Sequence, residues 1–460
     1  MKSTKTIILA AGQGTRMASK MSKVLHKACG KSLLAHVICA NQSAGISDIS
    51  VIVGHQAEAV SATLPEDVTS YLQSELLGTG HAVMQAAPFF ENFDGNLLIL
   101  MGDAPLVRPE TLQEMIKRHD EGGYAATVLT ADFEDPTGYG RIVKSGDELI
   151  KIVEQKDATE EEAKIKEINS GMYCFDAKAL KKALEEITPE NSQGEYYLTD
   201  TIEILRNMGK KVGSYVTPDV DDIAAVNSKV QLAEVAKIMR GRINQRIMLE
   251  GAILMDPDTT YLSAETQIGQ DTIVYPGVVT EGKVTIGADC VIGQNTRIAD
   301  STIADGVTIH SSTILESTVD SGTQVGPYAY LRPHSHIGKN CKVGDFVEVK
   351  NSTMKDGAKA SHLTYIGDAE IGKNVNLGCG TVVVNYDGAN KALTVVEDDC
   401  FIGCNSNLVS PVRVKEGAYV AAGSTITRDV PEGSLAIARS KQTNKEGYAA
   451  YMPHAKKDKK

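Results

Sequence analysis

The chain has 460 residues, of which 42% are hydrophobic and 23% charged, and its formal net charge is −12. This length exceeds what one hydrophobic core supports and predicts at least two domains. An acidic chain lacks the basic field of a nucleic-acid-binding surface, and no run approaches the roughly 20 apolar residues of a membrane span. No apolar segment follows the N-terminal lysines as a secretory signal would. We therefore expect a cytoplasmic protein that binds neither nucleic acid nor membranes.

The eight cysteines form no Cys-x-x-Cys pair. Cys400 and Cys404 lie four residues apart, but no nearby histidine or second cysteine pair completes a zinc site. We expect ordinary reduced thiols rather than a structural zinc centre.

Residues 1–228 alternate short aliphatic runs with amphipathic stretches. The expected strands are Lys5–Ala11, Ile49–Val53, Asn96–Met101 and Ala125–Leu129, and the expected helices include Ser32–Ser43 and Glu110–Glu121. This alternation predicts a Rossmann-like α/β domain with a mostly parallel sheet. Because such sheets bind ligands at the carboxyl ends of their strands, the loops at 12–17 and 102–106 are the candidate binding loops.

Residues 229–250 contain no proline and one glycine, with apolar residues at Leu232, Val235, Ile238 and Met239. This pattern predicts a helical linker.

From residue 251 onward, an aliphatic or similar residue recurs every six positions. The series covers 268–298, resumes after slips at 319–349 and 371–383, and returns at 396–426, often with glycine next in the sequence. A period of six fits neither an α-helix nor simple alternation. It predicts that residues 251–460 form a left-handed parallel β-helix, in which aliphatic side chains stack inside triangular coils and small residues turn the corners.

The first candidate loop, LAAGQGTRM from Leu9 to Met17, follows the first expected strand. Glycines let a backbone approach phosphates, and free N–H groups bind their charge. Arg16 and Lys23 can both reach a triphosphate, which favours a phosphate site over a plain strand–helix turn.

This loop and the following Lys-Val-Leu-His resemble the sugar-1-phosphate nucleotidyltransferases. The further motifs narrow the resemblance to the bacterial family of bifunctional N-acetylglucosamine-1-phosphate uridylyltransferases/glucosamine-1-phosphate acetyltransferases. It covers essentially the whole chain, through segments that include Leu77–Ala82 (LGTGHA), Gly102–Leu106 (GDAPL), Gly138–Arg141 (GYGR), Asn169–Gly171 (NSG), Gln193–Tyr197 (QGEYY) and Val226–Asn227 (VN).

The resemblance implies a role for each matching position of residues 1–228. Asp103 and Asn227 would hold Mg²⁺, although Asp103 could instead cap its loop. Arg16 and Lys23 would face the phosphates as catalytic residues, and the UDP-N-acetylglucosamine contacts would be Leu9, Ala10, Ala11, Gly12, Lys23, Gln73, Gly78, Thr79, Gly140, Glu154, Asn169 and Asn227. Two positions depart from many relatives, since Ser22 replaces a proline and Gln13 a frequent lysine.

His362 is the candidate base of the β-helix, because acetyl transfer from a thioester to an amine needs a group that removes the amine proton. A histidine inside a repeat is otherwise a surface or coil residue. The insertion Asn385–Gly388 breaks the six-residue period, which is typical of a binding loop. By resemblance, His362 is the base and glucosamine-1-phosphate contacts Arg332, Lys350, Tyr365 and Asn376.

By the same resemblance, acetyl-CoA contacts Cys379, Asn385, Tyr386, Cys404, Ala422 and Arg439. Two thiols beside that groove lead us to expect that alkylation inhibits acetyl transfer unless acetyl-CoA protects the enzyme. The resemblance further implies a homotrimer assembled through the β-helix.

The implied activity is acetylation of glucosamine-1-phosphate by acetyl-CoA, followed by transfer of UMP from UTP to give UDP-N-acetylglucosamine and pyrophosphate, a cell-wall precursor synthesis. Two alternatives stay open. The β-helix could be only an oligomerisation and effector module on a single nucleotidyltransferase, or the chain could be an inactive sensor. The set His362, Asn385, Tyr386 and Arg439 disfavours the first, and Lys23, Asp103 and Asn227 disfavour the second.

Overall fold

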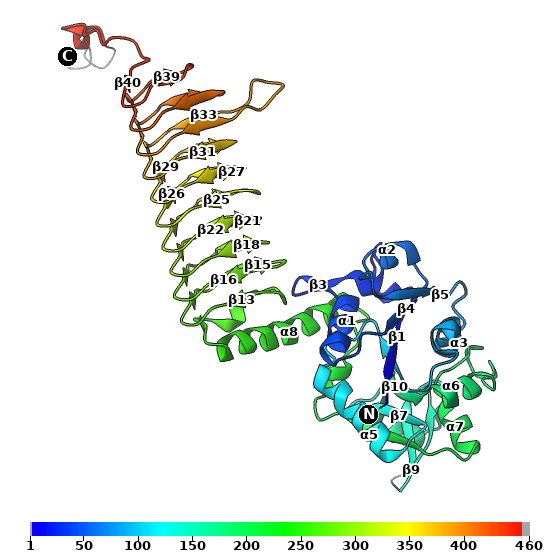
Figure 1. Cartoon of the computed structure of the whole chain (residues 1–460). Helices are drawn as coiled ribbons and strands as arrows, with labels where there is room; N and C mark the ends of the chain where they lie inside the picture. Colours follow the sequence, from blue (N-terminus) through cyan, green and yellow to red (C-terminus); the bar gives the residue numbers. More distant parts are fainter. Residues whose placement is uncertain (1, 147, 453–460) are drawn as a thin grey trace. The chain divides into compact units, whose positions relative to one another are not determined.

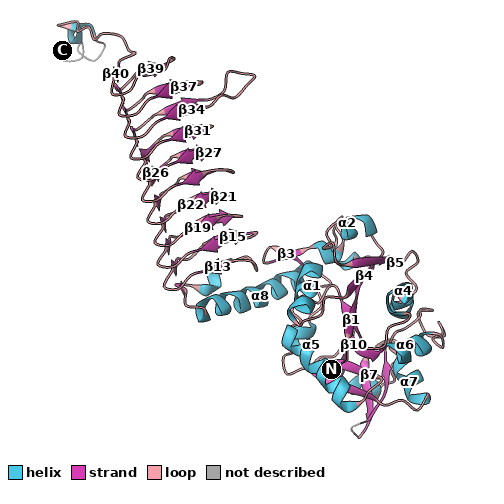
Figure 2. Ribbon diagram, in the orientation of Figure 1, coloured by secondary structure: helices cyan, strands magenta, loops and turns pink. Residues whose placement is uncertain are grey.

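The computed structural model describes residues 2–146 and 148–452, shown in Figures 1 and 2. The chain divides into two compact units, Met1–Arg242 and Ile243–Lys460, and residues 453–460 of the expected β-helix region lie outside the described part. Helix α8 (Lys229–Leu249) confirms the helix predicted over residues 229–250. The division between the two units falls inside this helix. Among the described helices, none combines the length and the apolar character needed to cross a membrane.

The first unit is built on a sheet with the strand order β11-β7-β10-β6-β1-β4-β5. β1 pairs in parallel with β4 and β6, which agrees with the predicted mostly parallel sheet, whereas β10 is antiparallel to both β6 and β7. The hairpin β8–β9 pairs with β10 beside this sheet. The strands are β1 (Thr4–Ala10), β4 (Ile49–Val53), β5 (Thr69–Leu72), β6 (Asn96–Met101), β7 (Ala126–Asp132), β8 (Arg141–Ser145), β9 (Glu148–Val153), β10 (Glu167–Asp176) and β11 (Val212–Val216).

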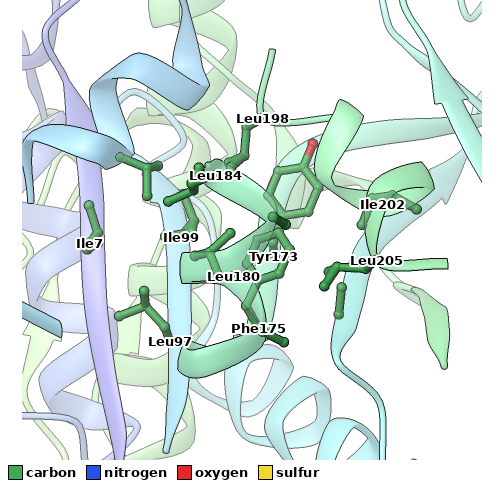
Figure 3. Close-up of a cluster of buried hydrophobic side chains, with 14 of the residues drawn as sticks. Ile7, Leu97, Ile99, Tyr173, Phe175, Leu180, Leu184, Leu198, Ile202 and Leu205 are labelled. Atoms are coloured by element: carbon green, nitrogen blue, oxygen red, sulfur yellow. The ribbon is translucent and has the colours of Figure 1, made fainter. Parts of the chain in front are cut away.

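Helices cover both faces of this sheet, which explains why the strands read as continuous aliphatic runs rather than as alternating ones. Figure 3 shows one of the two cores, where Ile7, Leu97 and Ile99 of the sheet lie with Leu180 and Leu184 of α6. The helices of the unit are α1 (Leu33–Ser43), α2 (Ala57–Ser61), α3 (Thr79–Gln85), α4 (Ala87–Phe90), α5 (Pro109–Gly122), α6 (Ala177–Leu184) and α7 (Asp200–Asn207).

The parallel pairing of β1 with β6 brings the two candidate loops to one edge of the sheet. Leu9 is the partner of Met101 in the register, and the Gly102 N–H donates to the Leu9 carbonyl at 2.9 Å. The loops that follow these two residues therefore begin side by side.

The second unit is a left-handed parallel β-helix made of three sheets with 11, 9 and 9 strands. The chain runs from a strand of the first β-helix sheet to the second and then the third, once per coil. These sheets extend from β12 (Ile253–Leu254) to β40 (Leu435–Ala436), from β15 (Val279–Glu281) to β39 (Thr425–Ile426), and from β13 (Gln267–Ile268) to β37 (Val412–Val414). The residues of the predicted six-residue series are buried, which confirms the repeat.

At each slip in the six-residue period, one of the three sides of a coil is one residue shorter than the others. Ile303, Ile314 and Met354 also point inward, although the six-residue period did not identify them. The corners before them turn on single residues in the left-handed region, such as Asp300 at φ 44° and Asn351 at φ 45°. The inward side chains of successive coils therefore stay aligned, although their spacing in the sequence is not always six residues.

His119 in α5 is a titratable group within the core of the first unit. It is 2% exposed, and its Nδ1 lies 3.0 Å from Thr127 Oγ1 of β7, while its Nε2 has no hydrogen-bond partner. Burial lowers the pKa of His119 to about 4. The folded chain therefore holds this imidazole neutral at a pH at which the unfolded chain protonates it.

We expect the first unit to lose stability as the pH falls from about 6.5 to about 4, because the unfolded state then binds the additional proton. The loss attributable to His119 is at most about 3 kcal/mol. His119→Asn keeps an amide facing Thr127 but does not titrate, so its acid destabilisation should be smaller. Urea unfolding followed by circular dichroism near neutral pH and near pH 5 measures this difference. The exposed His55→Asn variant is the control, and an acid loss in His119→Asn equal to that of the parent would contradict the assignment.

Candidate active sites

A pocket of about 230 Å³ lies at the carboxyl ends of β1 and β6. Nine of the residues predicted from the sequence line it, namely Leu9, Ala10, Ala11, Gly12, Lys23, Gln73, Gly78, Thr79 and Asp103. They come from four separate segments of the chain, and the sheet topology brings them together.

A second pocket, of about 200 Å³, shares Leu9, Thr79 and Met101 with the first, so the two are continuous. Besides Leu9 and Thr79, its lining includes three further predicted residues, Gly140, Glu154 and Asn169. It also includes residues that the sequence analysis did not select, Tyr139, Ser170, Gly171, Tyr173, Leu198 and Thr199. The motif around Tyr139 was recognised, but nothing in its composition distinguishes the tyrosine from its glycine neighbours.

Lys23 bridges the two residues expected to bind a metal. Its Nζ donates to Asp103 Oδ2 and, at 3.1 Å, to Asn227 Oδ1. The Val226 N–H donates to the Asp103 carbonyl at 2.9 Å and thereby fixes the segment that carries Asn227. The lysine itself packs against Gly14, which has φ +61° and where a Cβ would lie 2.7 Å from the Cβ of Lys23.

The arrangement around Asp103 suits a cation. Its carboxylate is buried, and Oδ1 has no hydrogen-bond partner. Carboxylate and amide oxygens are ligands that Mg²⁺ accepts, with substrate phosphates and waters completing its shell. The described residues contain no cluster of three or more His, Cys, Asp or Glu that could hold a metal. Asp103 and Asn227 would thus be a two-oxygen site completed by the substrate.

Arg16 is exposed and lines neither pocket, although its loop borders the first. The structure therefore does not bring it into the group formed by Lys23, Asp103 and Asn227.

Glu154 is the acidic residue that lines the second pocket. Burial raises the pKa of Glu154, and the nearby carboxylates of Asp157 and Asp200 raise it further. Burial also raises the pKa of Asp200, to about 6. Asn169 donates to the Tyr173 hydroxyl at 2.8 Å and accepts from the Gly171 N–H at 3.0 Å, which leaves one amide N–H for a ligand. Such groups suit the hydroxyl and amide groups of a sugar.

In the β-helix, one corner carries four of the eleven predicted site residues, His362, Cys379, Cys404 and Ala422. At this first corner, where the chain passes from the first to the second β-helix sheet, one position recurs on successive coils. Asp345 is the partner of His362 in the strand register, and the pairings of the following coils continue this position toward the C-terminus. The resulting corner column is Asp345, His362, Cys379, Cys404 and Ala422.

His362 ends β29 (Lys359–His362), and its Nδ1 lies 2.5 Å from Oδ1 of Asp345, which ends β26 (Lys342–Asp345). The hydrogen bond to His362 lowers the pKa of Asp345. An ionised carboxylate at Nδ1 favours the tautomer with the proton on that nitrogen, so the lone pair lies on Nε2. The sequence analysis did not select Asp345, since its partner is 17 residues away.

The residues expected to bind the sugar phosphate separate into two groups. Arg332, Lys350 and Tyr365 lie along the second β-helix sheet, at or beside β24 (Tyr330–Leu331), β27 (Glu348–Lys350) and β30 (Tyr365–Gly367). Arg332 pairs with Glu348 at 2.9 Å and Lys350 with Asp368 at 3.4 Å. Asn376, in β32 (Asn376–Leu377), belongs to the first β-helix sheet. One chain therefore does not bring Asn376 together with the other three.

The insertion after β33 (Val382–Val384) is anchored to the same region. Asn385 is buried and donates to Asp368 Oδ2, the same oxygen that Lys350 approaches. Tyr386 is 56% exposed, and its hydroxyl donates to the Gly388 carbonyl at 2.6 Å. Arg439 lies above the corner column, where its Cδ would be 3.7 Å from a Cβ on Gly423.

Known proteins match both units of the chain. A nucleotidyl transferase family model matches residues 5–236, and a model of bacterial transferase hexapeptide repeats matches residues 265–300, 316–351 and 393–428. A solved UDP-glucose pyrophosphorylase complexed with UDP-glucose aligns with 53% of this chain and 100% of its own, at 17% identity and a TM-score of 0.44.

Full-length relatives carry the name bifunctional protein GlmU. The chain is 54% identical to the one from Alkaliphilus metalliredigens over 98% of its own length and 99% of the relative's. It is 56% identical to the one from Alkaliphilus oremlandii and 53% identical to the one from Clostridioides difficile, each over 96% of this chain and 97% of the relative. Since the identity extends through both units, the chain is an enzyme of the bifunctional GlmU family, with a nucleotidyltransferase unit and a hexapeptide acyltransferase unit.

Proposed function

We propose that residues 251–460 acetylate glucosamine-1-phosphate with acetyl-CoA, and that residues 1–228, joined to them by the helix at 229–250, transfer UMP from UTP to the product. The products are UDP-N-acetylglucosamine and pyrophosphate. The observation that carries the proposal is that each unit has its own reactive group, the Lys23–Asp103–Asn227 cluster in one and the Asp345–His362 pair in the other. That pairing also disfavours a β-helix that serves only for oligomerisation.

For uridylyl transfer, the sugar phosphate oxygen attacks the α-phosphorus and needs no nucleophile from the protein. The first pocket would hold the nucleotide and the second the N-acetylglucosamine, because they are continuous and differ in polarity. Lys23 would neutralise phosphate charge, and Glu154 and Asn169 would orient the sugar. A divalent cation on Asp103 and Asn227 would supply further charge neutralisation.

For acetyl transfer, the amine of glucosamine-1-phosphate attacks the thioester carbon. His362 Nε2 would accept the amine proton, while Asp345 holds Nδ1 and stabilises the imidazolium. Arg332 and Lys350 would bind the phosphate by charge. The CoA chain would lie along Cys379, Cys404 and Ala422 toward Arg439. All eight cysteines are free thiols in the structure, which fits the cytoplasmic location we propose.

We expect His362→Ala to reduce acetyl transfer by about 10²- to 10⁴-fold, the usual contribution of a general base, and to spare uridylyl transfer. Asp103→Ala should do the reverse. Separate assays with glucosamine-1-phosphate plus acetyl-CoA, and with N-acetylglucosamine-1-phosphate plus UTP, measure the two activities. His336→Ala is a matched control, because His336 is exposed on the same β-helix and pairs with Asp320 at 2.9 Å. Equal loss of both activities in either variant would contradict the two-site proposal.

Asp345 is proposed as a positioning residue, and Asp345→Asn tests it. Loss of the carboxylate removes the acceptor that holds the His362 Nδ1 proton, so the imidazole is fixed less well with its lone pair on Nε2. The kcat for acetyl transfer should fall by about 10- to 100-fold, less than when the base itself is removed, while the KM for glucosamine-1-phosphate stays that of the parent. An unchanged kcat would indicate that the contact is only structural.

A trimer through the β-helix would complete the acetyl-transfer site. Asn376 lies on the first β-helix sheet, away from Arg332, Lys350 and Tyr365, so a second chain is needed to unite the set. Tyr328 and Phe346 support this, since they are 60% and 59% exposed, stack with centroids 5.5 Å apart and turn the first corner with positive φ. Bulky residues adopt this conformation at a cost of about 1–2 kcal/mol each, and a covering chain would offset it.

Co-expression of Lys350→Ala with Asn376→Ala should then restore acetyl transfer, because some interfaces receive both native side chains. Random mixing predicts that about a quarter of the sites are intact. Each variant expressed alone gives the baseline, and sedimentation equilibrium of the parent should find three chains. Co-expressed protein with no more activity than the variants alone would mean that the site lies within one chain.

A further inference from the structure

We propose that Cys379 and Cys404 are a thiol-modification site, at which a hydroperoxide closes a reversible disulfide between two coils of the β-helix. Its expected effect, inhibition of acetyl transfer, rests on the function proposed above. Formation of the bond itself does not depend on that function.

The two cysteines occupy equivalent positions on adjacent coils. β32 and β35 (Phe401–Ile402) pair Leu377 with Ile402, and the same register two residues later pairs Cys379 with Cys404. The Asn405 N–H donates to the Cys379 carbonyl at 2.7 Å, so the coils are in direct contact at this point. Neighbouring parallel strands are about 4.8 Å apart, which falls within the roughly 4.4–6.8 Å Cα separation of disulfides.

Side chains in the corner column reach from coil to coil. His362 and Asp345 hold the same position two and three coils below Cys404, and they meet at 2.5 Å. This contact shows that the column directs neighbouring side chains along one line on the outside of the corner. Cys379 and Cys404 continue that line next to His362.

The pair is also open to an oxidant, unlike the other cysteines of the β-helix. Cys290, Cys341 and Cys400 are buried and donate to backbone carbonyls at 3.1, 3.2 and 3.0 Å. Burial raises the pKa of all three, that of Cys341 to about 11, so these thiols stay protonated. Cys404 is exposed and Cys379 half-buried. Because the thiolate is the reactive form and needs access, oxidation should select this pair.

The reaction balances with hydrogen peroxide as the oxidant. The Cys404 thiolate attacks one peroxide oxygen, the O–O bond breaks, and protonation of the leaving hydroxide gives water and a sulfenic acid on Cys404. The Cys379 thiolate then attacks that sulfur, the S–O bond breaks, and a second water leaves. The two thiols have lost two protons and two electrons, and one peroxide has become two waters. A dithiol reductant reverses the bond by exchange.

The disulfide would change the groove directly beside His362. It draws together two column positions along which the CoA chain is proposed to lie, and it removes their thiols from that surface. Displacement of reacting groups by roughly 1 Å costs about a hundredfold in rate. Uridylyl transfer occurs in the other unit and should not respond.

The test oxidises the full-length enzyme with hydrogen peroxide, blocks free thiols and maps the peptides by mass spectrometry. We expect a linked peptide that contains Cys379 and Cys404, about a hundredfold loss of acetyl transfer, unchanged uridylyl transfer, and recovery with dithiothreitol. Cys379→Ser and Cys404→Ser should each yield no linked peptide, and neither should show the dithiothreitol-reversible loss relative to its own reduced form. Cys39→Ser, which removes a half-buried thiol of the other unit, is the matched control and should respond as the parent does.

The absence of the linked peptide after oxidation would overturn the proposal, and so would its presence with undiminished acetyl transfer. Failure of the proposed function gives a different result, since the reduced parent enzyme would then show no acetyl transfer while the peptide map still reports whether the bond forms.

Discussion

The stacking of inward side chains along the β-helix is the constraint on which the acetyl-transfer unit depends. Each inward residue rests on its equivalents in the adjacent coils, and a shift by one residue would turn the inward set outward. The register is therefore fixed, and the corners are aligned as a consequence. Asp345, His362, Cys379 and Cys404 are 17, 17 and 25 residues apart in sequence, yet they form one column.

The nucleotidyltransferase unit positions its groups by a different device. Parallel pairing of β1 and β6 ends both strands at one edge, and one hydrogen bond from Val226 to the Asp103 carbonyl adds a segment from far along the chain. Lys23, Asp103 and Asn227 meet there with little freedom, because the carboxylate is buried and the lysine packs on Gly14. The residues of this site are positioned by the edge of a sheet, whereas those of the acetyl-transfer site are positioned by the repeated coils of the β-helix.

The sequence was most informative where a local pattern repeats. The strands at β1, β4 and β6, the helix α8 and the inward series of the β-helix were all predictable, because hydrophobic periodicity determines them directly. The antiparallel strand β10 was not, since a buried strand has the same composition in either direction. Asp345 was missed because the shortened side at Met354 places its partner 17 rather than 18 residues away, and a strict period cannot follow such changes. The placement of Asn376 apart from Tyr365 could not be read from spacing either, because it depends on which of three sheets each residue joins.

The insertion at Asn385 shows how this architecture accommodates change. Between Val383 and Val396 the chain takes 13 steps instead of six, yet the strands on either side keep their in-register partners. The additional residues leave the prism sideways at a corner, so the coils above and below carry no strain from them. A corner of such a prism can therefore acquire or lose a loop almost independently of the rest, and new contacts to a bound molecule can evolve there without endangering the stack.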